Sequence, residues 1–189
     1  AGDGGAWETV LRWSRRPTGR QRVGVFDSNR RGTVEAVHVA AAGPLGISQP
    51  LVAGITVDVA RLVRVVPWGD TEGFLTVLGE VGVDTAAVIL DPVAAQFGVV
   101  PPEPRFLRAV EEKTRAVGAL LVLDETLTGF RLARGGATEV FGLTPDVAVF
   151  GGSLGGGISP GAAVAWRRSL RVAGGDDLEP VAQSGHAAM

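Results

Sequence analysis

Short runs of consecutive apolar residues recur along the second half of the chain, and an acidic residue or glycine stands at or near the end of each run. The clearest runs cover residues 85–93, 119–125 and 146–152. A run of this length without alternating polar positions is typical of a strand that is buried on both faces. A fourth apolar run, over residues 161–166, is a weaker strand candidate.

Helical spacing of apolar positions separates these runs. It predicts helices over residues 6–16, 71–82 and 101–118. The first of them is expected to end before Pro17, because proline and the following Gly19 are stop signals. Two more strands are predicted over residues 22–27 and 61–68, and the Gly-, Ala- and Pro-rich stretch 40–54 is predicted to be loop.

Alternating apolar strands and helices indicate an α/β fold, a mostly parallel sheet sandwiched by helices. Residues 1–189 are interpreted as a single domain, without internal repeats. Ligands of open α/β sheets bind beyond the carboxyl ends of the strands. The candidate site residues therefore lie on one edge of the sheet, and they are Asp91, Asp124, Glu125 and the glycine-rich turn that contains Gly151 and Gly152.

Composition removes several classes of function. The formal net charge is −2 with no basic block, so nucleic acid is an unexpected partner. No apolar run is long enough to cross a bilayer, so no membrane contact is expected and the cytoplasm is the expected location. The chain has no cysteine, and its two histidines are far apart, so no metal site is expected. Lys113, between Glu112 and Thr114 in a predicted helix, is the only lysine, which leaves an amine nucleophile one possible position.

Asp124 and Glu125 are the best candidates for chemistry, because carboxylates at a buried strand end can move protons or hold a protonated ring nitrogen. A structural role is equally compatible with the sequence: they could cap the following loop or pair with an arginine such as Arg131. Asp91 is a weaker catalytic candidate, because an Asp-Pro pair after a strand is often only a turn.

Two long stretches carry a resemblance to a known family. They read "LLVLDETLTGFRLARGGATEVFGLTPDVAVFGGSLGGGISPGA" and "AAVILDPVAAQFGVVPPEPRFLRAVEEKTRAVGALL". Both resemble the class III aminotransferases, and among them the glutamate-1-semialdehyde aminomutases. The resemblance implies the large, cofactor-binding domain of a fold-type I pyridoxal phosphate enzyme. The chain is expected to be a truncated or excised piece, without the family's N-terminal segment and C-terminal small domain.

The resemblance assigns roles to individual positions. The family's aspartate that pairs with the pyridine nitrogen matches Asp124, and the acid of its strand-ending Glu-Pro matches Asp91. The Schiff-base lysine, which follows the glycine matching Gly151, falls on Gly152. Glycine has no side chain, so no covalent bond to the cofactor is expected there, and Lys113 is expected to be too far away to replace it.

Other cofactor contacts of the family are also altered. Its phosphate-binding turn matches residues 2–5, where Gly4 is kept but Asp3 introduces a negative charge. Arg30 and Arg31 stand where the family has an aromatic ring over the cofactor. His186 stands where a threonine reaches the phosphate of the neighbouring subunit.

Three hypotheses follow. The leading one is a pseudoenzyme: a catalytically degenerate aminotransferase-like domain, without cofactor, that acts as a structural or interaction module in a homodimer or with a partner subunit. The first alternative is a lysine-independent enzyme whose acids and arginines bind a small acidic metabolite, with or without non-covalent pyridoxamine phosphate. The second alternative is an ordinary pyridoxal phosphate-dependent aminotransferase or aminomutase.

Overall fold

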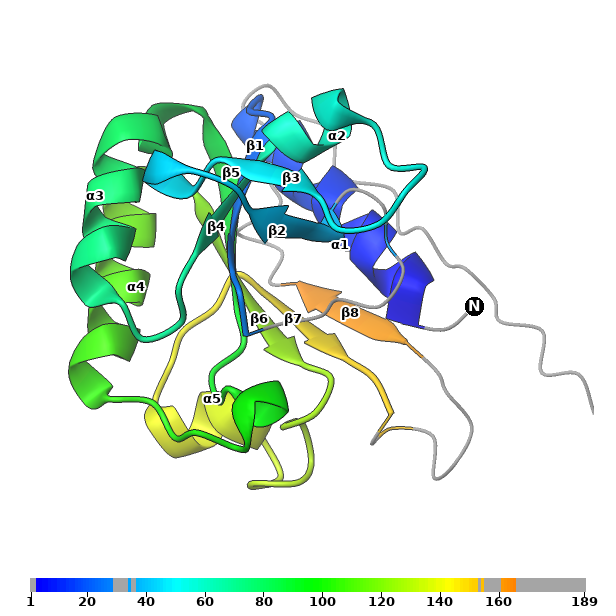
Figure 1. The fold of residues 1–189 in the computed structure, drawn as a ribbon. Coiled ribbons are helices and arrows are strands. Elements are labelled where there is room, and N and C mark those ends of the chain that lie inside the picture. The colour runs from blue at the N-terminus through cyan, green and yellow to red at the C-terminus, as the bar shows by residue number, and fades with distance from the viewer. Residues whose placement is uncertain (1–2, 29–33, 35–36, 153, 155–160, 166–189) are drawn as a thin grey trace, which may run out of the picture.

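A six-stranded sheet forms the centre of the molecule in the computed structural model, which describes residues 3–28, 34, 37–152, 154 and 161–165 (Figure 1). Its strand order is β4-β1-β5-β6-β7-β8. The strands are β1 (Arg22–Phe26), β4 (Val63–Val66), β5 (Thr85–Leu90), β6 (Leu120–Glu125), β7 (Val147–Phe150) and β8 (Ala162–Ala165). The helices are α1 (Asp3–Thr18), α2 (Val57–Arg61), α3 (Thr71–Val81), α4 (Pro104–Ala116) and α5 (Gly136–Phe141).

All neighbouring strands of this sheet are parallel except β8, which pairs antiparallel with β7. The predicted α/β class with a mostly parallel sheet is therefore confirmed. The weaker strand candidate over residues 161–166 is also confirmed, as the edge strand β8. Since β1, β5, β6 and β7 run in the same direction, their carboxyl ends lie at one edge of the sheet.

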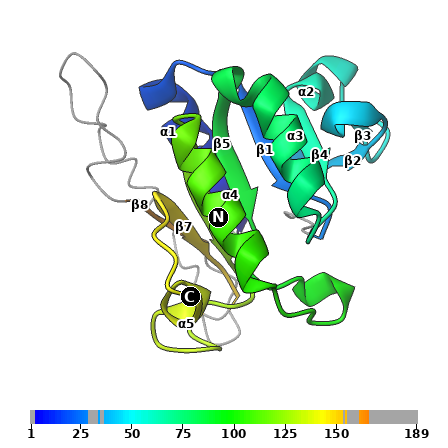
Figure 2. The same cartoon turned by 90° about the vertical axis from the view of Figure 1, so that its left-hand side faces the viewer.

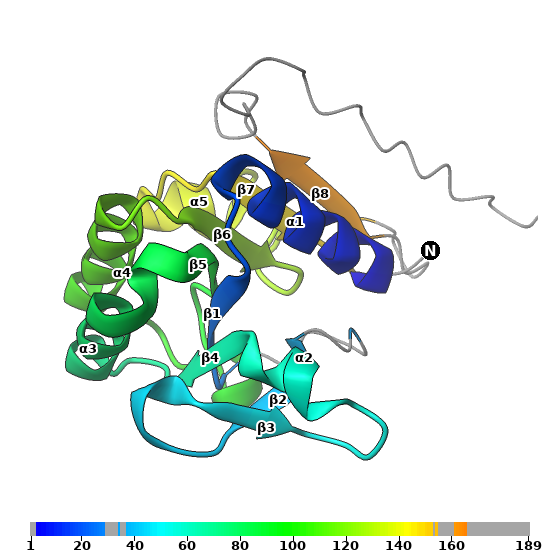
Figure 3. The ribbon, with the colours of Figure 1, turned by 90° about the horizontal axis from the view of Figure 1, so that it is seen from above.

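The two faces of the sheet are covered by different helices, as the view from above shows (Figure 3). Strand residues alternate between these faces because the side-chain period of a strand is two. In β5, for example, Ala87 and Ile89 belong to the core on the α1 side, whereas Val88 and Leu90 belong to the core that contains residues of α3 and α4. Figure 2 shows α3 and α4 side by side over that second face.

The first helix continues further than the sequence predicts. α1 passes through Pro17 and ends at Thr18. A proline so close to the end of a helix removes only one backbone hydrogen bond, and the Thr18 hydroxyl donates to the carbonyl of Ser14 at 2.7 Å. The actual stop is Gly19, which has a φ of 65° and donates its amide to the Arg15 carbonyl at 2.9 Å.

The predicted loop over residues 40–54 was wrong in part. It contains most of a small antiparallel hairpin, formed by β2 (Val39–Ala41) and β3 (Ser48–Pro50), which lies beside β4 (Figure 3). The predicted strand 61–68 is shorter than expected, because α2 occupies its first residue. These short elements are stabilised by tertiary contacts such as the Ser48 hydroxyl, which donates to the carbonyl of Ala60 at 2.6 Å.

An arginine joins three segments at the amino-terminal edge of the sheet, opposite the candidate site. The Arg20 guanidinium donates to the carbonyl oxygens of Val117 at 2.7 Å, Thr85 at 3.1 Å and Gly82 at 3.4 Å. These carbonyls belong to the ends of helical segments and to the start of β5. Arg20 therefore fixes the edge of the sheet from which the strands run toward the site.

Candidate functional site

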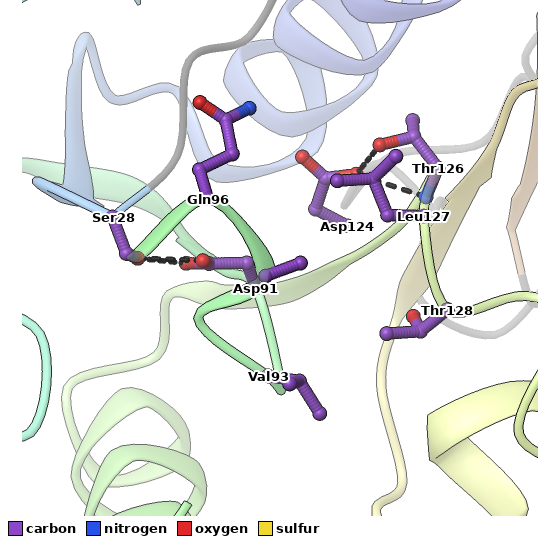
Figure 4. A pocket seen from close by; sticks show the side chains of 9 residues that line it. Ser28, Asp91, Val93, Gln96, Asp124, Thr126, Leu127 and Thr128 are labelled. Atoms are coloured by element: carbon purple, nitrogen blue, oxygen red, sulfur yellow. Dashed lines mark hydrogen bonds between the residues drawn. The ribbon is translucent and has the colours of Figure 1, made fainter. Parts of the chain in front are cut away.

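A shallow hollow lies at the carboxyl edge of the sheet, where β1, β5 and β6 end (Figure 4). Of the three acids that the sequence predicts at this edge, Asp91 and Asp124 line the hollow as expected, whereas the prediction was wrong for Glu125, which does not line it. Its lining residues are Ser28, Asp91, Val93, Ala95, Gln96, Asp124, Thr126, Leu127 and Thr128.

Asp91 is tied to the neighbouring strand β1. The Ser28 hydroxyl lies 2.6 Å from Oδ1 and 2.5 Å from Oδ2 of Asp91, so one donor spans both carboxylate oxygens. Asp91 is 7% exposed. Its backbone carbonyl accepts a hydrogen bond from the indole nitrogen of Trp68 at 2.9 Å. Asp91 is therefore fixed from two sides, at the rim of the hollow.

Asp124 is held by the residue two positions further along the chain. Its Oδ1 accepts hydrogen bonds from the Thr126 backbone N–H at 3.0 Å and from the Thr126 hydroxyl at 2.5 Å (Figure 4). Asp124 is 5% exposed. A carboxylate with this burial and this fixed orientation suits a cationic or proton-donating group of a ligand in the hollow.

Glu125 is fully buried and does not line the hollow. Its Oε1 accepts hydrogen bonds from the backbone N–H and the hydroxyl of Thr138, both at 2.8 Å. Its Oε2 accepts from the Ala137 backbone N–H at 3.0 Å and from the Thr128 hydroxyl. The carboxylate thus receives four donors, from the loop after β6 and from the first turn of α5, a helix that the sequence analysis missed.

Gly136 makes this arrangement sterically feasible. It adopts a φ of 68°, a conformation that side chains rarely tolerate. A Cβ at this position would lie 2.6 Å from Oε2 and 2.7 Å from Oε1 of Glu125. The alternation of side chains along β6 is the sequence signal that separates the two acids: Val122 and Asp124 share one face, and Leu123 and Glu125 the other.

The end of β7 supplies backbone without a side chain. Gly151 is buried, and Gly152 is exposed. A Cβ built on Gly152 would meet no atom of the described residues within 4 Å, so these residues leave room for a side chain there. Lys113 lies in the last turn of α4, which leads into the start of β6. Since β6 carries Asp124 at its other end, Lys113 lies at the opposite edge of the sheet from the hollow.

The first turn of α1 lies at the same edge as the hollow. α1 packs against the sheet and leads into β1, so it runs antiparallel to the strands and starts near their carboxyl ends. Gly4 is in this turn, and a Cβ there would lie 3.8 Å from Val34 Cγ2, an ordinary contact. The first backbone N–H groups of a helix favour an anion. Arg30, Arg31 and His186 lie outside the described residues.

The described part of the chain contains neither a metal-binding cluster nor a membrane-spanning helix. Its Asp, Glu and His side chains include no group of three or more that could bind a metal ion. None of its helices has the length and hydropathy that a bilayer-spanning segment requires.

The model of the aminotransferase class-III family matches residues 71–174, more than half of the chain. The chain belongs to the class III aminotransferases. Its curated relatives include the glutamate-1-semialdehyde 2,1-aminomutases of Thermus thermophilus, 42% identical over 94% of the chain, and of Methylacidiphilum infernorum, 41% identical over 82%. These matches confirm the family that the sequence analysis expects.

Solved structures confirm the fold of this class III chain. An omega-transaminase from Sphaerobacter thermophilus superposes with a TM-score of 0.82 at 29% identity, covering 89% of this chain and 40% of that one. A lysine-to-alanine variant of a glutamate-1-semialdehyde aminomutase from Pseudomonas aeruginosa, in complex with PMP, gives 0.76 at 30% identity and covers 89% and 37%. The chain spans 36% and 41% of the length of the two aminomutases compared above.

Proposed function

We propose that this domain has lost the lysine-dependent reaction of class III aminotransferases and binds pyridoxamine phosphate or pyridoxal phosphate without a covalent bond. The observation that carries the proposal is the contrast between two strand ends. β6 presents Asp124, buried and oriented at the hollow, whereas β7 is followed directly by Gly151 and Gly152. The only lysine of the chain, Lys113, lies at the opposite edge of the sheet.

The described residues fit such a group at the ring end. The first turn of α1 keeps the backbone N–H groups that favour an anion, and the negative charge of Asp3 opposes this preference. Asp124 would keep the ring nitrogen protonated by accepting a hydrogen bond from it. This is the role that the resemblance assigns to Asp124. The N–H groups around Gly4 would bind the phosphate, as helix N-termini commonly do. Asp91, fixed by Ser28, would orient a donor group at the rim of the hollow. When bound, the cofactor supplies an electron-withdrawing ring to an attached amine.

The comparisons support non-covalent binding. The Pseudomonas aeruginosa aminomutase variant, in which alanine replaces a lysine, is in complex with PMP, the common abbreviation of pyridoxamine phosphate. A relative with this fold and a substituted lysine therefore binds the compound. A homodimer or a partner subunit, a small acidic metabolite as ligand, and a cytoplasmic location stay predictions of the sequence.

Titration of the chain with each compound tests the proposal. Isothermal titration calorimetry is expected to detect saturable binding of pyridoxamine phosphate. After addition of pyridoxal phosphate and reduction with borohydride, mass spectrometry is expected to find no stoichiometric adduct. Absence of binding of both compounds would overturn the proposal in favour of a cofactor-free interaction module. A stoichiometric adduct on the unmodified chain would also overturn it, in favour of ordinary lysine chemistry.

Replacing Gly152 by lysine is expected to create a covalent attachment site. Within the described part of the chain the substitution meets no steric obstacle, because none of its atoms lies within 4 Å of the new Cβ. In a Lys113→Arg background, Gly152→Lys should give one reducible pyridoxal phosphate adduct per chain, located on the introduced lysine by peptide mapping. Transamination is not expected to return, because the sequence at the phosphate and ring contacts is also altered.

The matched control is Gly79→Lys in the same background. Gly79 is an exposed glycine of α3, and a Cβ added to it would also have no atom within 4 Å. Gly79 lies on a helix outside the hollow. A lysine introduced there should therefore react with pyridoxal phosphate only as weakly as an ordinary surface amine. Equal labelling of both variants would mean that the end of β7 does not face the bound compound.

A further inference from the structure

We infer that Thr126 is a positioning residue that sets the affinity of the hollow for a protonated ring nitrogen, by holding the carboxylate of Asp124 in one orientation. The inference deepens the proposed function and rests on it. It assigns to Thr126 a role that the resemblance does not give, since the family comparison singles out only the aspartate.

The geometry of two hydrogen bonds from Thr126 to Asp124 supports this role. Both donors of Thr126, its backbone N–H and its hydroxyl, reach the same oxygen, Oδ1 of Asp124. Two donors on one oxygen restrict rotation of the carboxylate group about its bond to Cβ more than one donor does. The two hydrogen bonds therefore help to hold the plane of the carboxylate relative to the end of β6.

The location of Thr126 at the hollow also supports this role. Asp124 and Thr126 both line the hollow, so the fixed carboxylate belongs to the surface that a ligand would contact (Figure 4). Thr128 lies on the same loop and also lines the hollow, but its hydroxyl donates to the buried Glu125. The two threonines of the loop after β6 thus bind different carboxylates, and of these two it is Thr126 that binds the carboxylate lining the hollow.

The binding energy of a protonated ligand nitrogen is expected to depend on this positioning. A charge-assisted hydrogen bond between a carboxylate and a protonated nitrogen depends strongly on direction. A group that is held in its binding orientation before the ligand arrives loses less conformational freedom on binding. Removal of the Thr126 hydroxyl is therefore expected to weaken binding of pyridoxamine phosphate about tenfold, the usual order for one hydrogen bond to a charged group.

The experiment compares the unmodified chain with Thr126→Val, which keeps the shape of the side chain and the backbone donor but loses the hydroxyl. Thr126→Ser restores the hydroxyl and is expected to restore the affinity. Thr144→Val is the matched control: the hydroxyl of this exposed threonine donates to the carboxylate of Glu111, away from the hollow. Its dissociation constant for pyridoxamine phosphate should equal that of the unmodified chain.

A spectroscopic readout separates positioning from general structural damage. The absorbance of bound pyridoxamine phosphate reports whether its ring nitrogen is protonated. In Thr126→Val the bound compound should lose that proton at a lower pH than in the unmodified chain, whereas the denaturant midpoint of the free protein should stay nearly unchanged.

The outcomes distinguish the inference from the function on which it rests. If the unmodified chain binds pyridoxamine phosphate and Thr126→Val matches it in both affinity and absorbance, the inference is overturned while the proposed function stands. If Thr126→Ser fails to recover affinity, the hydroxyl is not the relevant group, and the inference fails as well. If the unmodified chain binds nothing, the inference and the proposed function both fail.

Discussion

Glu125→Gln is expected to lower the free energy of unfolding by about 2–4 kcal/mol, although it changes one oxygen for an amide group of the same size. Both oxygens of the Glu125 carboxylate accept hydrogen bonds, and two of the four donors are the backbone N–H groups of Ala137 and Thr138. A glutamine offers only one accepting oxygen. One buried backbone N–H would therefore face the amide NH₂ and lose its partner. Chemical denaturation followed by circular dichroism measures the difference.

Glu111→Gln is the matched control. The Glu111 carboxylate also binds the backbone N–H and the hydroxyl of a threonine, here Thr144, and Arg115 as well. All three donors reach Oε1, so a glutamine keeps an acceptor for each of them. A loss below about 1 kcal/mol is expected for this site, where the Glu111 side chain is 16% exposed and its partners Arg115 and Thr144 lie at the surface. If both variants lose the same stability, the four-donor arrangement of Glu125 is not what stabilises the region.

Phe106→Ala is expected to cost about 3–5 kcal/mol, the usual range for removing a buried phenylalanine side chain. The Phe106 ring is 1% exposed and packs edge-on against Phe26, with ring centroids 5.3 Å apart, and against Trp68 at 5.4 Å. The Trp68 indole in turn donates to the carbonyl of Asp91. The cavity should therefore also loosen the support of Asp91 and shift the fluorescence of Trp68.

The control for this variant is Phe97→Ala. Phe97 follows β5 in the same region of the fold, but its side chain is 55% exposed, so the change should stay within about 0.5 kcal/mol. The denaturant midpoint of each variant measures the effect. A loss below about 1 kcal/mol in Phe106→Ala would mean that the surrounding rings close the cavity.

The apolar runs were sufficient to predict the central strands, because a strand buried on both faces leaves an uninterrupted hydrophobic signal. They also located Asp91 and Asp124 at one edge of the sheet, since parallel strands end together. The hairpin of β2 and β3 was missed because strands of three residues in a Gly- and Pro-rich stretch carry no period.

α5 was missed for a different reason. Its six residues begin at a glycine with positive φ, which gives no local sign of a helix start. Its first turn is stabilised instead by the Glu125 side chain, which accepts hydrogen bonds from residues 12 and 13 positions further along the chain. A local pattern cannot reveal such a partner. The opposite orientations of Asp124 and Glu125 could have been derived, because neighbouring residues of a strand face opposite ways.

The neighbouring acids at the end of β6 have a consequence for how descendants of this fold diverge. Asp124 faces the ligand side of the sheet edge, and Glu125 holds the start of α5 in place. Selection on ligand chemistry and selection on folding therefore act on adjacent residues. A lineage that abandons ligand binding would be free to change Asp124, whereas a change of Glu125 would still cost stability. A glutamate kept at this position would therefore reflect architecture, and an aspartate kept beside it would reflect ligand binding.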